Sequence, residues 1–172
     1  MGTRGNIIVK ESEKGVILVN MYHHMDSYPS GLGVKLADFL KDRVVVNGIS
    51  MAETRKISNG ISDLAAQVVT LLKRSSENSG GVYIKHPKSP LSDPNDYTYI
   101  IYPVTETKTG EGYNKKPFTY EQETGEIVVK VHNWKKEIFK GTAINFGIWI
   151  ENIVNDEEAQ REARKLIKEI SY

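Results

Sequence analysis

Residues 6–24, NIIVKESEKGVILVNMYHH, decide the first part of the fold. Both ends of this segment, residues 6–10 and 16–24, are rich in β-branched residues, as strands are. Between them, the Glu-Lys-Gly sequence of residues 13–15 is typical of a tight turn. The segment therefore predicts an antiparallel β-hairpin at the start of the chain.

Outside the hairpin, the spacing of apolar residues predicts further strands and helices. Short apolar or alternating runs predict strands at residues 43–49, 82–85, 97–104 and 126–132. Apolar residues at helical spacing predict helices at residues 31–41, 61–74 and 156–171. Ser30 would cap the first of these helices, and Ser58 or Asn59 would cap the second.

Residues 141–153, GTAINFGIWIENI, fit two kinds of element. Alternating isoleucine and phenylalanine residues favour a strand, whereas Phe146, Trp149 and Ile150 would share one face of a helix. Thr142 can supply a side-chain cap, which favours the helix.

The predicted elements follow the order hairpin, helices, strands, helices, without the regular alternation of strand and helix that a parallel sheet needs. We expect an α+β fold: a mainly antiparallel sheet that starts with the N-terminal hairpin and has three to four helices packed on it. At 172 residues the chain fits a single domain, 1–172. Within it, the polar stretch at residues 105–125 is rich in glycine and lysine and predicts a flexible hairpin arm.

The composition excludes several classes of function. With 23 basic and 22 acidic residues the formal net charge is +1, which argues against general nucleic-acid binding. The absence of cysteine excludes disulfides, cysteine–zinc sites and thiol nucleophiles. The sequence shows neither a signal-peptide pattern nor an apolar run of membrane-spanning length, so we expect a cytoplasmic protein without a membrane partner. It indicates no cofactor.

Residues 22–33, YHHMDSYPSGLG, concentrate reactive side chains where a strand ends and a helix begins. His24 can exchange protons near neutral pH, Asp26 can orient a histidine, and Tyr28 can donate a hydrogen bond. His23 shares the apolar face of the strand, so His24 is the preferred site candidate.

The glycine-rich part of this segment predicts an anion site. Ser30, Gly31 and Gly33 would bring backbone N–H groups to the start of a helix, where negative charge is favoured. The hairpin register would add Arg4 from the paired strand. The predicted site for a small anionic or nucleotide-like ligand consists of Arg4, His24, Asp26, Tyr28, Ser30, Gly31 and Gly33. An ordinary strand-to-helix turn would use the same residue types, with Arg4 as a solvated terminal charge.

No metal site is predicted, although His23, His24 and Asp26 are all ligand types. Adjacent residues of a strand point to opposite faces, so both histidines could meet one ion only beyond the end of the strand. The other histidines, His86 and His132, stand alone in the sequence.

Two motifs, MGTR at residues 1–4 and Tyr-x-x-x-Asp-x-Tyr-Pro-x-Gly-x-Gly at residues 22–33, together carry a resemblance. The chain resembles a group of uncharacterised proteins of bacteria, phages and other mobile elements, which open with MGTRS and carry a DGYP-type motif before a helix. The resemblance covers roughly residues 1–105 and, more weakly, residues 125–155. It implies a mobile-element or host–virus setting, and it implies no reaction.

The chain departs from the pattern of that group at two positions. Gly5 stands where serine is usual, and Ser27 stands where glycine is usual. The second departure argues against a need for left-handed backbone at residue 27.

Three functions compete. The first is a non-enzymatic protein that binds a phosphorylated or nucleotide-like ligand, as a viral or mobile-element counter-defence factor. The second is a phosphodiester hydrolase or nuclease, with His24 as general base or acid, Asp26 orienting it and Arg4 stabilising negative charge. The third is an inhibitor that contacts a host protein through the 105–125 arm, and an oligomer is compatible with each. The sequence favours the first, because it shows no evident set of nucleophile, base and orienting residue.

Overall fold

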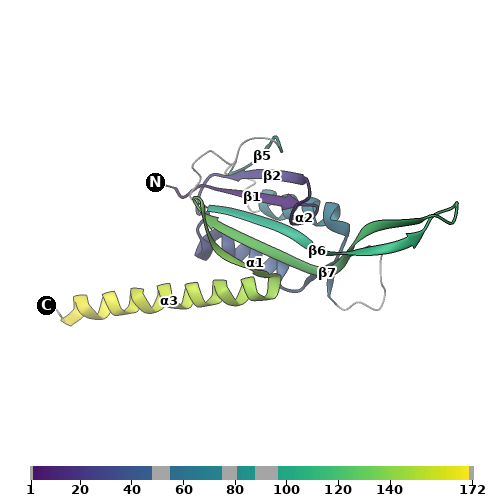
Figure 1. Ribbon diagram of the computed structural model, residues 1–172. Coiled ribbons are helices and arrows are strands. Elements are labelled where there is room, and N and C mark those ends of the chain that lie inside the picture. The colour runs from purple at the N-terminus through teal and green to yellow at the C-terminus, as the bar shows by residue number, and fades with distance from the viewer. Residues whose placement is uncertain (1, 48–54, 75–80, 88–96, 171–172) are drawn as a thin grey trace.

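The computed structural model describes residues 2–47, 55–74, 81–87 and 97–170 (Figure 1). In chain order its elements are β1 (Gly5–Lys10), β2 (Ile17–His23), the π-helical turn η1 (Pro29–Gly33), α1 (Val34–Leu40), β3 (Arg43–Val46), β4 (Lys56–Asn59), α2 (Gly60–Arg74), β5 (Val82–Lys85), β6 (Tyr97–Glu111), β7 (Pro117–Asn133), β8 (Lys136–Thr142) and α3 (Ala143–Ile170). No helix in the described part of the chain is long and apolar enough to cross a membrane.

These elements form an α+β fold, which confirms the predicted class. The main sheet has six strands in the order β5-β2-β1-β6-β7-β8. Its neighbouring strands are antiparallel except for β1 and β6, which are parallel. A second, two-stranded parallel sheet joins β3 to β4. The helices α1 and α2 lie on one face of the main sheet (Figure 1).

The predicted antiparallel N-terminal hairpin is confirmed, with a register one residue away from the one that a turn centred on Glu13 and Lys14 predicts. Gly5 lies opposite His23, and Ile7 lies opposite Met21. Arg4 therefore immediately precedes the last pair, close to the end of β2. This register puts Ile7 and Met21 on the inner face of the sheet, where both are fully buried.

The core fills the space between this inner face and the helices. Its largest fully buried side chains include Tyr99 of β6, Leu36 of α1, Leu64 of α2 and Phe146 of α3. Burying an aliphatic or aromatic side chain of this size contributes about 1.5–3 kcal/mol. The Tyr99 and Phe146 rings meet edge to face, with centroids 6.3 Å apart. The core therefore fixes the start of α3 against the sheet.

The region that fitted both a strand and a helix is helical. α3 begins at Ala143, and the N–H group of Asn145 donates to Thr142 Oγ1 at 3.2 Å. Thr142 is thus the predicted cap. The helix predicted at 156–171 is the continuation of the same helix, which extends away from the body (Figure 1). Residue 171 lies outside the described residues.

The caps predicted at Ser30 and Ser58 are wrong. Helical backbone begins at Pro29, so Ser30 lies inside the first turn, and Tyr28 takes the cap position without a side-chain hydrogen bond. At the start of α2, the N–H group of Ile61 donates to a carboxylate of β7, Glu123, at 2.9 Å. The Ser58 hydroxyl donates instead to Gln67 at 2.8 Å.

The strand predicted at 43–49 is shorter in the structure, where β3 ends at Val46, and residues 48 and 49 lie outside the described residues. The strands β4 and β8 were not predicted. β4 is short, and β8 combines glycine and lysine with few β-branched residues, so neither has a strong strand pattern.

The 105–125 stretch is a paired ribbon. β6 and β7 continue beyond the sheet with regular pairing from Thr105–Glu123 to Glu111–Pro117. At its tip the Gly112 N–H group donates to the Lys116 carbonyl at 2.9 Å. The ribbon, which we call the arm, projects from the body (Figure 1).

Candidate functional site

The N-terminal segment and the loop after β2 are interlocked through the backbone. The Ser27 N–H group donates to the Thr3 carbonyl at 3.1 Å, and the Ser27 carbonyl accepts from the buried Tyr99 hydroxyl at 2.9 Å. Tyr97 donates to the Arg4 carbonyl at 3.2 Å. The two motifs, at residues 1–4 and 22–33, therefore build one structural unit.

Backbone conformation at this corner depends on Asp26 and Gly31. Asp26 has left-handed backbone, with φ of 56°, whereas Ser27 does not. This turn brings the Asp26 carbonyl onto η1, where it accepts from the Leu32 N–H group at 2.9 Å. A Cβ atom at Gly31 would lie 2.4 Å from the same carbonyl oxygen. Residue 31 must be glycine because the two backbone segments meet there.

Two of the three backbone donors expected to cradle an anion, those of Gly31 and Gly33, are occupied. Gly31 and Gly33 donate to the Tyr28 carbonyl, at 3.0 and 3.4 Å, and Leu32 donates to the Asp26 carbonyl. The π-helical turn folds the loop's own carbonyls over these N–H groups. A ligand at this corner would therefore meet side chains rather than an amide cradle.

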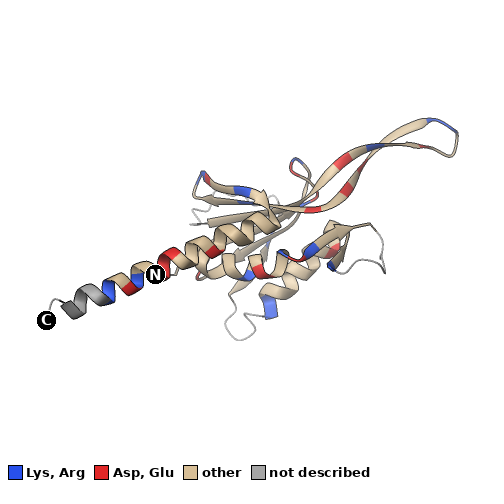
Figure 2. Cartoon of the chain, turned by 90° about the horizontal axis from the view of Figure 1, so that it is seen from below, with Lys and Arg blue, Asp and Glu red and all other residues tan. Residues whose placement is uncertain are grey.

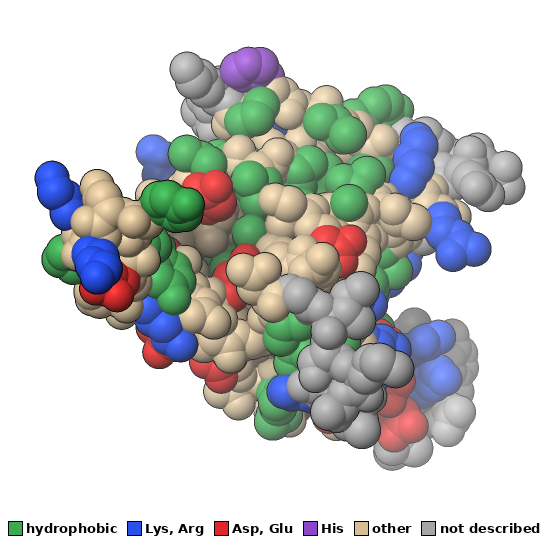
Figure 3. All heavy atoms as spheres, turned by 90° about the vertical axis from the view of Figure 1, so that its right-hand side faces the viewer, with side chains coloured by type: hydrophobic (Ala, Val, Ile, Leu, Met, Phe, Trp, Pro, Cys, Tyr) green, Lys and Arg blue, Asp and Glu red, His purple; other side chains and the backbone are tan. Residues whose placement is uncertain are grey.

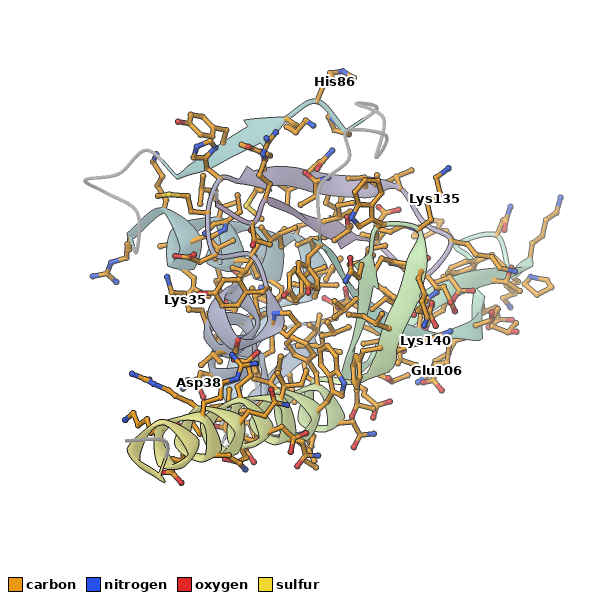
Figure 4. The ribbon with its side chains drawn as sticks, turned by 90° about the vertical axis from the view of Figure 1, so that its left-hand side faces the viewer. Lys35, Asp38, His86, Glu106, Lys135 and Lys140 are labelled. Carbon is orange, nitrogen blue, oxygen red and sulfur yellow. The ribbon has the colours of Figure 1, made fainter. Side chains whose placement is uncertain are left out.

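A hollow of about 410 Å³ lies beside the turn, and we call it the corner pocket. Its lining consists of His23, Met25, Asp26, Tyr28, Ser30, Gly31, Leu32, Val34, Lys35 and Gly81. The volume falls in the range of about 300–1,000 Å³ that is typical of small-molecule sites. Lys35 projects from α1 and is exposed (Figure 4).

His23 is held at the floor of the corner pocket in its neutral form. Its Nδ1 atom lies 2.8 Å from the Ser27 hydroxyl. Burial lowers the pKa of His23 below its usual value, and the charge of Lys35 and the neighbouring His24 lower it further, while Asp26 opposes them. With Nδ1 engaged, Nε2 is the ring nitrogen left to meet a ligand.

The structure brings only part of the predicted site together. Of the seven predicted residues, Asp26, Tyr28, Ser30 and Gly31 line the corner pocket. Arg4, His24 and Gly33 are not part of its lining.

The three other predicted residues lie nearby with different neighbours. His24 is exposed, and its Nδ1 atom lies 3.0 Å from the hydroxyl of Tyr22 on the outer face of the sheet. A Cβ atom at Gly33 would meet the end of Ile150, 2.6 Å away on α3, so this glycine serves helix packing. Arg4 contributes its carbonyl to the sheet.

Six of the ten lining residues were not in the predicted site, and two of these six, His23 and Lys35, have ionisable side chains. His23 was assigned to the core because it shares a strand face with Met21, but β2 ends there and the loop opens a hollow above it. Lys35 could have been found from spacing: it follows Gly31 by four residues, which places both on one face of the helix.

The described residues contain no group of three or more histidine and carboxylate side chains that could hold a metal ion. His23 and His24 engage Ser27 and Tyr22 respectively, on opposite faces of the strand.

Comparisons with known proteins find no matching protein family, no similar curated protein and no similar solved structure. The corner pocket is therefore interpreted from its own geometry and charges.

Proposed function

We propose that the protein binds a small phosphorylated, nucleotide-like ligand in the corner pocket. One observation carries this proposal: three complementary groups line the same pocket. They are the exposed ammonium group of Lys35, the neutral imidazole of His23 and the carboxylate of Asp26. These groups come from a helix, a strand end and a loop that the interlocked backbone holds in place.

The mixture of charges favours a ligand with two kinds of group. Lys35 supplies a counter-charge to a phosphate, and the hydroxyls of Tyr28 and Ser30 can donate to its oxygens. Asp26 would repel a bare anion at the same place. A ligand that also carries hydrogen-bond donors, such as sugar hydroxyls or an amino group on a base, can donate to this carboxylate. A nucleotide has both kinds of group.

In the mobile-element or host–virus setting that the resemblance implies, such a protein would sequester a nucleotide signal of a host defence. Sequestration needs affinity and no turnover, in keeping with a site built from hydrogen bonds and charges.

Calorimetry against AMP, cyclic AMP and cyclic dinucleotides tests this proposal. We expect wild-type protein to bind at least one of them, and Lys35→Met to weaken that binding about tenfold, since a hydrogen bond to a charged group contributes about 1.5–3 kcal/mol. Lys41→Met is the matched control. Lys41 is the residue directly after α1, and its ammonium group pairs with Asp38 at 2.9 Å. Binding of none of these nucleotides, or equal binding by Lys35→Met and wild type, would count against the proposal.

Binding of an anion should also be accompanied by proton uptake at His23. The pKa of His23 is lowered in the free protein, so the imidazole is neutral at pH 7. A nearby phosphate raises that pKa, and affinity for the anion should therefore increase as the pH falls below 6.5.

Cyclic AMP is a suitable probe for this effect, because its phosphodiester does not titrate in that range. Calorimetry at pH 6.5 in two buffers of different ionisation enthalpy measures the uptake. We expect His23→Gln to abolish it and His132→Gln, outside the pocket, to leave it unchanged. Binding by wild type without proton uptake would place the phosphate away from His23.

A phosphodiester hydrolase is the second candidate, and one observation favours it. The pocket holds a neutral histidine oriented by Ser27, which is what a general base requires. His23 would take the general acid–base role that the sequence predicts for His24. Hydrolysis of a cyclic nucleotide by wild type, lost in His23→Gln with binding retained, would favour this candidate over sequestration.

A further inference from the structure

The arm is a two-stranded ribbon with seven cross-strand pairs beyond the body of the sheet. At about 3.3 Å per residue it is roughly 23 Å long. A two-stranded ribbon is marginally stable by itself in water, because half of its backbone groups and both faces are solvated. The arm nevertheless has regular pairing and a hydrogen-bonded tip, which favours a segment that contacts a partner.

One face of the arm is aromatic. The rings of Phe118 and Tyr120 lie 5.6 Å apart and are 50% and 42% exposed. They cover Gly110, where a Cβ atom would lie 2.9 Å from the end of the Phe118 ring. At the tip, Tyr113 is fully exposed. Figure 3 views the molecule from the side on which the arm projects and shows hydrophobic side chains at this surface beside charged ones.

Charge is divided along the arm. The tip carries Lys115 and Lys116, with Glu111 as the nearest carboxylate in sequence. Between the body and the tip the arm carries several glutamates together with Lys108, whose ammonium group pairs with Glu106 at 3.0 Å. Figure 2 shows red and blue segments there and blue at the tip. Glu121 is fixed there by the Thr107 hydroxyl at 2.6 Å.

A polar hollow of about 750 Å³, the base groove, lies where the arm leaves the body. Its described lining is formed by Glu11, Ser12, Asn47, Asn59, Gly60, Ile61, Ser62, Thr105, Tyr120, Glu121, Gln122 and Glu123. Three of these side chains are glutamates, and none of the described lining residues is a lysine or arginine. The base groove is thus complementary to a cationic segment that also carries an aromatic ring.

We propose that two copies of the chain exchange arms, with the tip of each arm seated in the base groove of the other. Two arms that lie side by side in opposite directions bring each cationic tip to an acidic base. Tyr113 then enters the groove, and Lys115 and Lys116 meet Glu11 and Glu121 of the second copy.

The second copy is favoured over other partners because both complementary surfaces belong to the same chain. A two-fold axis between the arms satisfies both contacts at once and leaves no tip or groove unpaired, as a closed isologous dimer requires. The aromatic faces, with Phe118 and Tyr120, then meet near the axis.

A charge exchange tests the proposal, with sedimentation velocity over a concentration series as the measurement. We expect wild type to dimerise and both K115E/K116E and E11K/E121K to weaken the dimer at least tenfold. Mixing the two variants should restore a dimer, because each reversed tip then meets a reversed groove. K135E/K136E is the matched control: it reverses two adjacent exposed lysines, one in the β7–β8 turn and one at the start of β8, and should dimerise like wild type.

Two further measurements separate loss of the dimer from loss of folding and set the concentration at which wild type must associate. A chain in which Asn-Gly replaces residues 107–121 should be monomeric with an unchanged Tm, which shows that folding does not depend on the arm. Wild type that stays monomeric up to about 1 mM, a concentration near the weak limit of specific association, would overturn the proposal. So would a mixture of the two variants that stays monomeric while wild type dimerises.

This proposal is independent of ligand binding. The corner pocket lies near the start of β6, and the arm continues from the other end of the same strand. K115E/K116E should therefore bind cyclic AMP as wild type does.

Discussion

Replacing Gly31 by alanine is expected to lower the free energy of unfolding by about 3 kcal/mol, the upper part of the range for overpacked substitutions. The added Cβ atom would lie 2.4 Å from the Asp26 carbonyl oxygen and 3.0 Å from the Tyr28 ring. The first of these is a backbone atom, and it is tied to η1 by the hydrogen bond from Leu32. Relief of this clash therefore requires a shift of the backbone from Asp26 to η1.

Gly147→Ala is the matched control for this substitution. Gly147 also lies in a helix, α3, but a Cβ atom there would meet only Lys41, at an ordinary 3.9 Å. Because alanine is the better helix former by about 0.5–1 kcal/mol, the control should be stabilised. Urea denaturation of both variants measures the two effects. Equal stability of Gly31→Ala and wild type would show that the two backbone segments do not meet as described.

The second large effect is a coupled one between Gly5 and Ser27. A Cβ atom at Gly5 would lie 2.6 Å from the Cβ atom of Ser27 and 3.1 Å from the Tyr97 carbonyl. Gly5→Ser should therefore cost about 2 kcal/mol. Ser27→Gly removes the hydroxyl that contacts His23 and should cost about 1 kcal/mol.

The double variant, Gly5→Ser with Ser27→Gly, should be more stable than the sum of the two costs predicts. The clash with Ser27 disappears, although the close approach to the Tyr97 carbonyl remains, and the new hydroxyl lies opposite His23, the cross-strand partner of residue 5. We expect a coupling free energy of about 1–2 kcal/mol from a double-mutant cycle in urea. Additive costs would show that the two side chains do not share one space.

Gly5 and Ser27 thus compete for one space in the structure. The sequence alone does not predict this contact, because the two residues lie 22 positions apart and meet only in the folded chain. The hairpin register brings residue 5 opposite His23, and the Asp26 turn then folds Ser27 over it.

The parts of the fold that rest on local pattern were predictable. The hairpin, α2 and the Thr142 cap each follow from periodicity or turn chemistry within a few residues. The parallel pairing of β1 with β6 joins residues about ninety positions apart and leaves no local signal. The same is true of Glu123 of β7, which accepts a hydrogen bond from the first turn of α2.

For the site, the segment was predictable and its geometry was not. Asp26, Tyr28, Ser30 and Gly31 line the corner pocket, since all belong to the turn itself. Strand alternation assigned the two histidines by face, but the rule stops where the strand stops, and His23 is its last residue. The amide cradle assumed an ordinary helix start, and the π-helical turn uses those N–H groups internally.

The central claim is that the corner pocket binds a nucleotide-like ligand, and NMR titration with cyclic AMP tests it most directly. Resonances of the His23 ring, the Tyr28 ring and the Lys35 side chain should shift together with one dissociation constant. Those of His132 and of Tyr113 on the arm should not move. Shifts confined to the base groove beside Glu121, or none at millimolar cyclic AMP, AMP and cyclic dinucleotide, would contradict the claim.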